Sequence, residues 1–342
     1  MNILLIIFTF FLTLLSVYLL IKYALWLGLV DVPNERSVHK VLTPRGAGIG
    51  FAGSVLAALL LFGFGHLSEY YYIYLSILLV FAVGLLDDRG DVSPKLKFVF
   101  IFFATLLLYF NGVYIDRLGS YFGYEICLPA GIPVFLFSFF AIAGYTNALN
   151  LIDGLDGLAG TVSIIILAAF LAIGLIHGDE LIITLSSLFI AALVAFLYFN
   201  WHPAKIFMGD SGSLTLGFVI SILSIKSLVY ITPAAMLFII AIPILDTFIV
   251  MTRRLQRGIS PFTADKNHLH HFLYNMKADV KFTVMLLIYI QLAFSIIGYQ
   301  LRTSDNLLSL ILFGTLFFIF LNLFDQRIRK RRKPKRKRNK KG

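Results

Sequence analysis

The sequence predicts an all-α protein, a polytopic membrane helix bundle with about eleven transmembrane helices. Hydrophobic residues make up 59% of the 342 residues, charged residues make up only 14%, and the mean hydropathy is +0.88. A soluble chain of this length would need more charge to cover its core, so the composition indicates a membrane protein. The apolar residues also occur in stretches of about 20, the length that a helix needs to cross the hydrocarbon core.

Eleven apolar stretches are long enough to be such helices. They begin near residues 2, 46, 70, 96, 129, 158, 180, 211, 230, 282 and 305. The first is too long for the apolar region of a signal peptide and no basic segment precedes it, so we expect it to be retained as a helix. The eighth is the least regular, because Ser224, Lys226 and Ser227 shorten its apolar run.

The basic residues predict how the bundle is oriented. An odd number of spans places the two termini on opposite sides, and twelve of the 29 Lys and Arg residues lie between Gln326 and Lys341. With the C-terminus in the cytoplasm, all basic residues but three fall on the cytoplasmic side, the exceptions being Arg117, Lys226 and Arg302. Because cytoplasmic loops carry the excess of Lys and Arg in membrane proteins, we expect an external N-terminus and a cytoplasmic C-terminus.

The chain divides into a transmembrane domain, residues 1–325, and a basic tail, residues 326–342. A segment with this density of like charge and no apolar face is expected to be disordered and to lie on anionic lipid. The formal charge of +11 thus belongs largely to a tail, and we expect no nucleic-acid partner. The single cysteine, Cys127, excludes an internal disulfide and a cysteine-based metal cluster.

The polar residues with chemical potential lie in five loops, all on the predicted cytoplasmic side. These loops cover about residues 29–46, 87–96, 147–158, 200–212 and 252–281. We therefore expect the functional site at the cytoplasmic face.

Two acidic positions next to predicted helix ends suggest a bound cation. Asp87 and Asp88 end the third span, where adjacent carboxylates repel one another unless they share a cation or a proton. A solvated pair at a helix end is the alternative. Asp210 begins the eighth span, where it either caps the helix or offers an oxygen to Mg²⁺, which binds through one or two carboxylates and substrate phosphates.

A second motif repeats polar side chains with helical spacing. Asp153 and Asp156 are three residues apart, and so are Asn147 and Asn150. On a helix or in a tight turn each pair faces one way, and the intervening glycines allow a ligand to approach the backbone closely. Packing alone does not account for this spacing in an almost uncharged stretch.

The longest predicted loop combines arginine with histidine. Arg253 and Arg254 end the ninth span, and three of the seven histidines follow within four positions, at His268, His270 and His271. The histidines lack the cysteine or glutamate partners of a zinc site, whereas guanidinium and imidazole groups together suit a pyrophosphate. A stop-transfer role is the alternative for the two arginines. Asp246 lies deeper in the same span and should face the bundle interior.

Together, the five motifs resemble the polyprenyl-phosphate N-acetylhexosamine-1-phosphate transferase family, in particular its bacterial undecaprenyl-phosphate GlcNAc-1-phosphate transferases. The likeness covers about residues 31–271. The segment Ser260-Pro261-Phe262, together with Asp265 and the run His268-Leu269-His270-His271, favours this branch over the phospho-MurNAc-pentapeptide branch.

The resemblance implies an enzyme of the bacterial inner membrane whose active site faces the cytoplasm. It would transfer N-acetylhexosamine 1-phosphate, with GlcNAc as the first expectation, from the UDP-sugar to undecaprenyl phosphate and release UMP. The product would start a cell-envelope polysaccharide such as an O-antigen or a teichoic acid. The implied cofactor is Mg²⁺, with Mn²⁺ as a substitute.

The resemblance also assigns roles to individual positions. The catalytic candidates are Asp87, Asp88, Asp153, Asp156 and His268. The substrate-binding candidates are Asn147, Asn200, Phe207, Arg253, Arg254, His270 and His271, with the phenylalanine stacked on uracil. The metal-ligand candidates are Asn150 and Asp210. We expect a direct displacement without a protein base, because a phosphate monoester with a second pKa of about 6 is already largely ionised.

Other functions remain as alternatives from the sequence alone. A phospho-MurNAc-pentapeptide-type transferase shares the family motifs, and a transporter of lipid-linked sugars also carries acidic residues in its spans. The transporter would place polar motifs on both faces, whereas these collect on one. A membrane scaffold would leave the paired carboxylates unexplained. The sequence does not decide which hexosamine is used or whether the chain forms a homodimer.

Overall fold

The computed structural model describes residues 3–31, 42–260, 268–277 and 279–332 of the chain. Within these ranges the chain forms fourteen helices and two sheets of two strands each. The predicted all-α membrane bundle is confirmed. The residues outside these ranges include part of the first and last predicted loops and the final ten residues of the basic tail.

The helices follow one another closely along the chain. The first six are α1 (Ile3–Leu27), α2 (Ala47–Phe62), α3 (Phe64–Glu69), α4 (Tyr71–Arg89), α5 (Pro94–Phe110) and α6 (Ile132–Ile152). The next four are α7 (Leu158–His177), α8 (Glu180–Asn200), α9 (Asp210–Ser227) and α10 (Pro233–Ile239). The last four are α11 (Ala241–Gln256), α12 (Leu269–Lys277), α13 (Val280–Gln300) and α14 (Asn306–Arg332).

The strands are short and lie in two of the connections. β1 (Val30–Asp31) pairs antiparallel with β2 (Thr43–Pro44), and β3 (Arg117–Tyr121) forms an antiparallel hairpin with β4 (Tyr124–Cys127). At the other end of the chain, α14 continues to Arg332, past the predicted start of the tail at residue 326.

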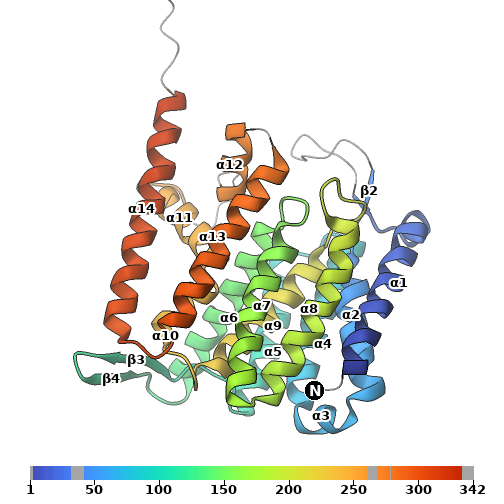
Figure 1. The fold of residues 1–342 in the computed structure, drawn as a ribbon, viewed down its shortest axis with the longest axis horizontal. Coiled ribbons are helices and arrows are strands. Elements are labelled where there is room, and N and C mark those ends of the chain that lie inside the picture. The colour runs from blue at the N-terminus through green and yellow to red at the C-terminus, as the bar shows by residue number, and fades with distance from the viewer. Residues whose placement is uncertain (1–2, 32–41, 261–267, 278, 333–342) are drawn as a thin grey trace, which may run out of the picture.

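Each of the eleven predicted spans is helical, with α10 and α11 together in the place of the ninth. Seven helices of the described chain are long and apolar enough to cross a membrane, and the bent pair α10 and α11 makes up to eight. In Figure 1 the helices run up and down between two ends, so that α1 begins at one end and α14 finishes at the other. The count of eleven spans and the direction of the bundle stay predictions.

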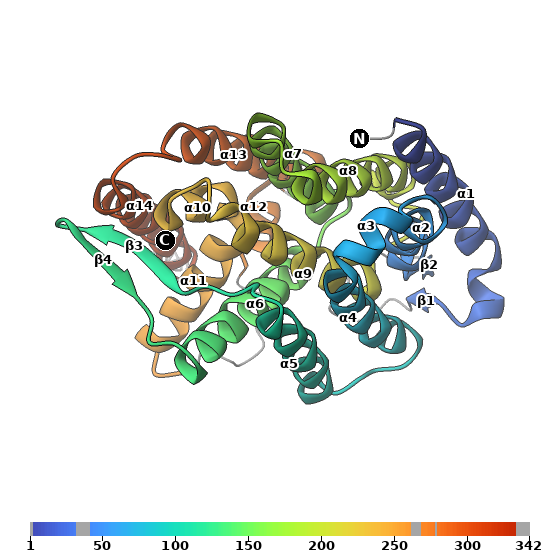
Figure 2. The same ribbon diagram turned by 90° about the horizontal axis from the view of Figure 1, so that it is seen from below.

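Helix α9 lies in the middle of the bundle (Figure 2). Every residue of α9 except Asp210 and Lys226 is buried, and the helix contacts α2, α4, α6 and α7. A helix that is apolar on all sides is stable only inside a protein or a membrane. Its neighbours surround α9, so its N-terminus is a fixed point in the fold.

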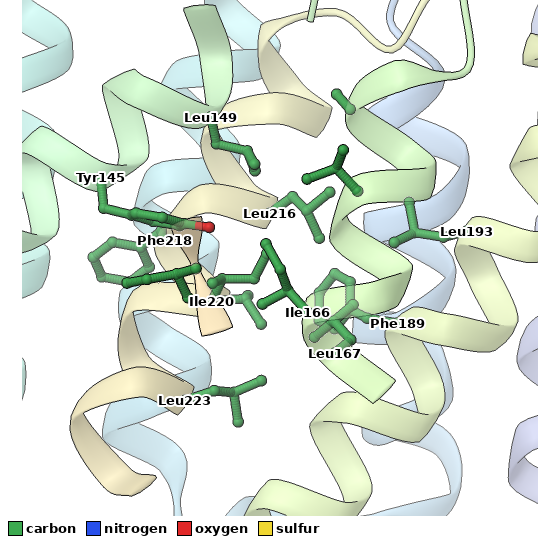
Figure 3. Close-up of a cluster of buried hydrophobic side chains, with 14 of the residues drawn as sticks. Tyr145, Leu149, Ile166, Leu167, Phe189, Leu193, Leu216, Phe218, Ile220 and Leu223 are labelled. Atoms are coloured by element: carbon green, nitrogen blue, oxygen red, sulfur yellow. The ribbon is translucent and has the colours of Figure 1, made fainter. Parts of the chain in front are cut away.

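The core around α9 is made of interlocking aliphatic and aromatic side chains. Figure 3 shows side chains of α9 packed among side chains of α6, α7 and α8. The labelled residues are Leu216, Phe218, Ile220 and Leu223 of α9, Tyr145 and Leu149 of α6, Ile166 and Leu167 of α7, and Phe189 and Leu193 of α8. Lipid is as apolar as this core, so close packing rather than water exclusion must hold the helices together. Gly217 allows α9 to pack closely on α6, because a Cβ at this position would lie only 2.8 Å from the Thr146 Cα.

The pair α10 and α11 is bent by 92°, and a buried glutamine of α13 satisfies the backbone at the break. Gln291 is fully buried; its Nε2 donates to the Ile239 carbonyl at 2.8 Å and its Oε1 accepts from the Ile242 N–H at 3.0 Å. An irregular backbone inside a membrane protein needs such partners, because no water can replace them. One side chain thus bridges the two sides of the bend.

Replacing this glutamine should destabilise the bundle. Gln291→Leu leaves the Ile242 N–H without a partner, at about 1–3 kcal/mol for such a buried group, and leaves the Ile239 carbonyl with only the longer bond from Ser295 Oγ at 3.4 Å. We expect a lower thermal midpoint in detergent, measured by the loss of monodisperse protein after heating. Gln300→Leu, at the exposed end of the same helix, is the matched control and should melt like the wild type. Equal midpoints for the two variants would contradict this account of the bend.

Candidate functional site

A carboxylate from α4 holds the N-terminus of α9. Asp88 is 2% exposed, and its two oxygens accept the Asp210 N–H at 2.8 Å and the Ser211 N–H at 3.1 Å. The Ser211 hydroxyl donates to the same carboxylate. The first N–H groups of a helix lack partners within the helix, and the helix dipole favours a negative charge there. Asp88 therefore caps α9, whose own cap residue, Gly209, has no side chain.

Glycines allow α2, α4 and α9 to meet at this point. A Cβ at Gly209, where φ is +73°, would lie 2.5 Å from Asp88 Oδ1. Gly48 of α2 and Gly84 of α4 approach the α9 backbone so closely that a Cβ would lie at 2.0 Å and 2.6 Å from it. The Gly48 N–H also donates to the Met208 carbonyl at 2.9 Å. The first predicted loop reaches the same region through its backbone, where the Pro44 carbonyl accepts the Phe207 N–H at 2.8 Å.

A lysine bridges two of the acidic groups. The Nζ of Lys97, on α5, lies 2.8 Å from Asp87 Oδ1 and 2.5 Å from Asp210 Oδ2. On the other side of Asp210, Asn150 Nδ2 donates to Asp210 Oδ1 at 3.1 Å and to Ser213 Oγ at 2.8 Å. The structure therefore brings the two predicted metal-ligand positions, Asn150 and Asp210, into contact.

Asp153 lies beside this cluster, in the turn between α6 and α7. Burial raises its pKa to about 7, and the neighbouring carboxylates of Asp210, Asp88 and Asp156 act in the same direction. The site thus concentrates negative charge in a region with little water. Such a region favours a cation or a proton.

The donor set fits Mg²⁺ that arrives together with phosphate. No three His, Cys, Asp or Glu side chains in the described ranges are arranged to hold an ion by themselves. Mg²⁺ commonly uses one or two carboxylates and completes its shell with phosphates and water. Asp210 and Asp87 supply carboxylate oxygens, and the Lys97 ammonium lies where a cation satisfies both.

Two predicted site residues, the catalytic candidate Asp156 and the substrate-binding candidate Asn200, connect neighbouring loops. Asp156 Oδ2 accepts the Ala204 N–H at 3.1 Å and lies 2.7 Å from His202 Nδ1. Asn200 is buried; its Oδ1 accepts the Gly157 N–H at 2.9 Å and its Nδ2 donates to the Ile206 carbonyl at 2.8 Å. Both side chains join the turn after α6 to the loop before α9.

The first histidine of the cluster is held by an acid inside the bundle. Asp246 of α11 is 1% exposed, as predicted for its depth; its Oδ2 lies 2.6 Å from His268 Nδ1, and its Oδ1 accepts the Leu269 N–H at 2.5 Å. The carboxylate orients the imidazole through Nδ1 and leaves Nε2 as the second functional nitrogen. It also fixes the start of α12.

His270 places α12 against the turn between α6 and α7, which carries Asp153. His270 is 2% exposed, and burial lowers its pKa to about 3, so the ring is neutral at neutral pH. A Cβ at Gly154 would lie 2.4 Å from His270 Nε2, so the ring lies against the turn that carries Asp153. The His271 ring lies 4.3 Å from that of His270, between centroids.

The remaining candidates are placed less centrally. Arg253 is buried and Arg254 partly buried in the last turn of α11, while Phe207 is partly buried and pairs through its backbone with Pro44. Asn147 is exposed on α6, so the structure separates it from Asn150, which faces α9. Ser260 is described, but Pro261, Phe262 and Asp265 of the predicted motif lie outside the described residues.

Sequence reasoning missed three members of the site. In the sequence, Lys97 is only one of the basic residues that orient the bundle, although a lysine nine residues after an acidic pair is a usable signal. In the sequence, Ser211 and Ser213 likewise indicate only that a helix begins there. Their roles depend on contacts with Asp88 and Asn150, which are distant in sequence.

Comparison with known proteins is consistent with this site. A model of glycosyl transferase family 4 matches residues 70–228, which run from the start of α4 to the end of α9. This segment contains the acidic pair, the repeated Asn and Asp motif and Asp210.

Bacterial relatives match over most of the chain. A probable undecaprenyl-phosphate N-acetylglucosaminyl 1-phosphate transferase of Bacillus subtilis strain 168 is 34% identical over 304 residues, or 88% of this chain and 83% of the relative. The undecaprenyl-phosphate alpha-N-acetylglucosaminyl 1-phosphate transferases of Salmonella typhi and Escherichia coli K12 are each 35% identical over 77% of this chain and 74% of the relative.

The contact between Gly154 and His270 leads to a test that needs no assay of activity. In Gly154→Ala the added methyl should displace the imidazole and the start of α12, so His270 should react faster with diethylpyrocarbonate, as mapped by mass spectrometry. Gly144→Ala, on the preceding α6 and with open space around it, is the matched control. Equal labelling of His270 in both variants would show that α12 does not lie on this turn.

Proposed function

We propose the following activity for this chain, which belongs to the family of undecaprenyl-phosphate N-acetylglucosaminyl 1-phosphate transferases. The chain transfers N-acetylglucosamine 1-phosphate from UDP-N-acetylglucosamine to undecaprenyl phosphate and releases UMP. The observation that carries the proposal is the cluster of Asp87, Asp210, Lys97 and Asn150 at the N-terminus of α9. It lies at the end of the bundle that we assign to the cytoplasm.

The reaction joins two phosphates. An oxygen of the lipid phosphate attacks the β-phosphorus of the nucleotide sugar and forms a new P–O bond. The bond from the β-phosphorus to the bridging oxygen breaks, and UMP leaves with that oxygen and its electron pair. The attacking oxygen is already largely ionised, because the second pKa of a phosphate monoester is about 6. No side chain has to remove a proton.

The main barrier is then repulsion between two anions, and the site is suited to reduce it. Bound Mg²⁺ would be held by Asp210 and Asn150 together with substrate phosphate, and would neutralise charge that develops in the transition state. Lys97 adds an ammonium within reach of Asp87 and Asp210, and it can transfer its pairing from those carboxylates to a phosphate. Positioning and charge stabilisation supply most of the catalysis of phosphoryl transfer.

The other side of the site contributes cationic donors. When His268 is protonated, with Nδ1 held by Asp246, its Nε2 would donate a hydrogen bond to the pyrophosphate. Arg253 and Arg254 end the helix that also carries Asp246, so the same element positions both groups. These donors would hold the phosphate that leaves with UMP.

Asp88 has a different role from its neighbour in this scheme. Three donors of the α9 N-terminus occupy its oxygens, which makes it a positioning residue. Asp87 accepts the Val92 N–H and pairs with the Lys97 ammonium, a cation that a substrate phosphate could also engage. Asp87 is therefore the member of the pair that we assign to the lipid phosphate.

Purified protein in detergent provides the direct test. UMP release from UDP-N-acetylglucosamine should require both undecaprenyl phosphate and Mg²⁺, and should stop in EDTA. Asp210→Asn should lower turnover at least about 100-fold, the scale of losing one transition-state electrostatic contact, at an unchanged melting midpoint. Asp91→Asn, an exposed acid between α4 and α5, makes the same charge change and should leave turnover unaltered.

Two results would contradict the proposal. Turnover that persists in EDTA would remove the metal from the reaction. UMP release at the same rate without the lipid would mean that water or another group is the acceptor.

A further inference from the structure

The hairpin of β3 and β4 projects sideways beyond the helices at the end opposite the site. Figures 1 and 2, at right angles to one another, both show it extending past α14. It lies at the level where α5 ends and where α6 and α14 begin. In a membrane-spanning bundle this level is the boundary between hydrocarbon and headgroups.

The register of the hairpin separates its residues onto two faces. Tyr121 pairs with Tyr124 and Gly119 with Ile126, while Ser120 pairs with Glu125 and Arg117 with Cys127. Successive side chains of a strand point to opposite faces, and directly paired residues share a face. A register shift between Arg117 and Gly119 breaks the alternation there and puts Arg117 on the face of its partner Cys127. One face, the apolar face, therefore carries Gly119, Tyr121, Tyr124 and Ile126, and the other, the polar face, carries Arg117, Ser120, Glu125 and Cys127.

The apolar face is directed toward the helices of the bundle. A Cβ at Gly119 would lie 2.6 Å from the Asn306 side chain, and Asn306 is the first residue of α14, which runs from here to the site end (Figure 1). The face that carries Gly119 thus looks along α14 into the span region. The polar face looks away from it, and there Arg117 Nη1 lies 3.2 Å from Glu125 Oε1.

The outer half of the apolar face extends beyond the helices. Tyr124 is 78% exposed, Ile126 is 46% exposed, and Phe122 at the turn is 81% exposed. Large apolar side chains that line one face of a two-stranded hairpin need a cover. Tyrosine is enriched at the membrane interface because its ring lies among acyl chains while its hydroxyl reaches water.

We propose that this hairpin lies flat on the membrane, with its apolar face in the interfacial layer of the leaflet opposite the site. The bound partner is the lipid surface itself. The alternation of the two faces, the direction fixed by Asn306 and the lateral position at the span ends all agree with this occupant. The proposal rests on the bundle spanning a membrane and does not depend on the proposed catalytic activity.

The hairpin is also linked to α14 and α10. The Asn306 side chain that meets Gly119 also accepts the Ala234 N–H of α10 through Oδ1, at 3.3 Å. The hairpin, the start of α14 and the start of α10 are therefore linked at one residue. Lipid contact on the hairpin would set the depth of both helices in the membrane.

Spin labels on adjacent residues can test the proposal. Cys127, exposed on the polar face, is the native reporter. Ile126→Cys in a Cys127→Ser background places the same label one residue away on the apolar face. Collision rates with oxygen, which partitions into lipid, and with a nickel chelate, which stays in water, are measured by electron paramagnetic resonance in phospholipid nanodiscs. Tyr124→Cys and Ser120→Cys, in the same background, repeat the comparison at the next pair of positions.

We expect oxygen to be favoured at 126 and 124, and the nickel chelate at 127 and 120. Chelate access at all four positions would place the hairpin in water and overturn the proposal. Labels at 126 and 124 that neither reagent reaches would indicate that a protein partner or a second copy covers the apolar face, which also overturns it.

Discussion

The contact between Asp88 and the first turn of α9 is the constraint on which the rest of the site depends. A carboxylate buried to this extent is tolerated only when hydrogen bonds compensate for its lost hydration. Here two backbone N–H groups and a hydroxyl of α9 do so. Because α9 is buried on all sides, fixing its first residue also fixes Asp210 against Lys97 and Asn150. The glycines of α2, α4 and α9 are needed because any side chain would separate the three helix ends.

The same device recurs across the site, where acids and amides bind backbone groups of another segment. Asp156 and Asn200 join the two central loops, and Asp246 holds the start of α12. Several polar residues of the motifs thus serve the scaffold. The charge that remains for substrates is concentrated on Asp87, Asp153 and Asp210, beside one lysine. Because some polar residues bind the backbone of neighbouring segments, the residues left for substrates keep their relative positions, although the helices themselves are held together by packing.

The lengths of the apolar stretches were sufficient to predict the helices of the eleven spans, because each span is local in sequence. They gave no signal for α3, α12 or the two pairs of strands. They could not assign partners either. The carboxylate of Asp88 and the Ser211 amide are 123 positions apart, and their contact depends on glycines whose importance appears only when helices pack. In the sequence, Lys97 looks like one of the basic residues that orient the bundle, because its partner Asp210 is also distant along the chain. The bend that Gln291 bridges and the two faces of the hairpin likewise depend on tertiary contacts and on strand register.

Hydrogen exchange at the N-terminus of α9 tests the central constraint most directly. In Asp88→Asn, one acceptor oxygen becomes a donor, and the loss of a hydrogen bond to a charged group, about 1.5–3 kcal/mol, should speed exchange of the Asp210 and Ser211 amides at least about tenfold. Asp87→Asn should leave both amides protected, and the later turns of α9 should stay protected in both variants. Unchanged protection in Asp88→Asn, or equal loss in Asp87→Asn, would show that Asp88 does not hold α9 in place.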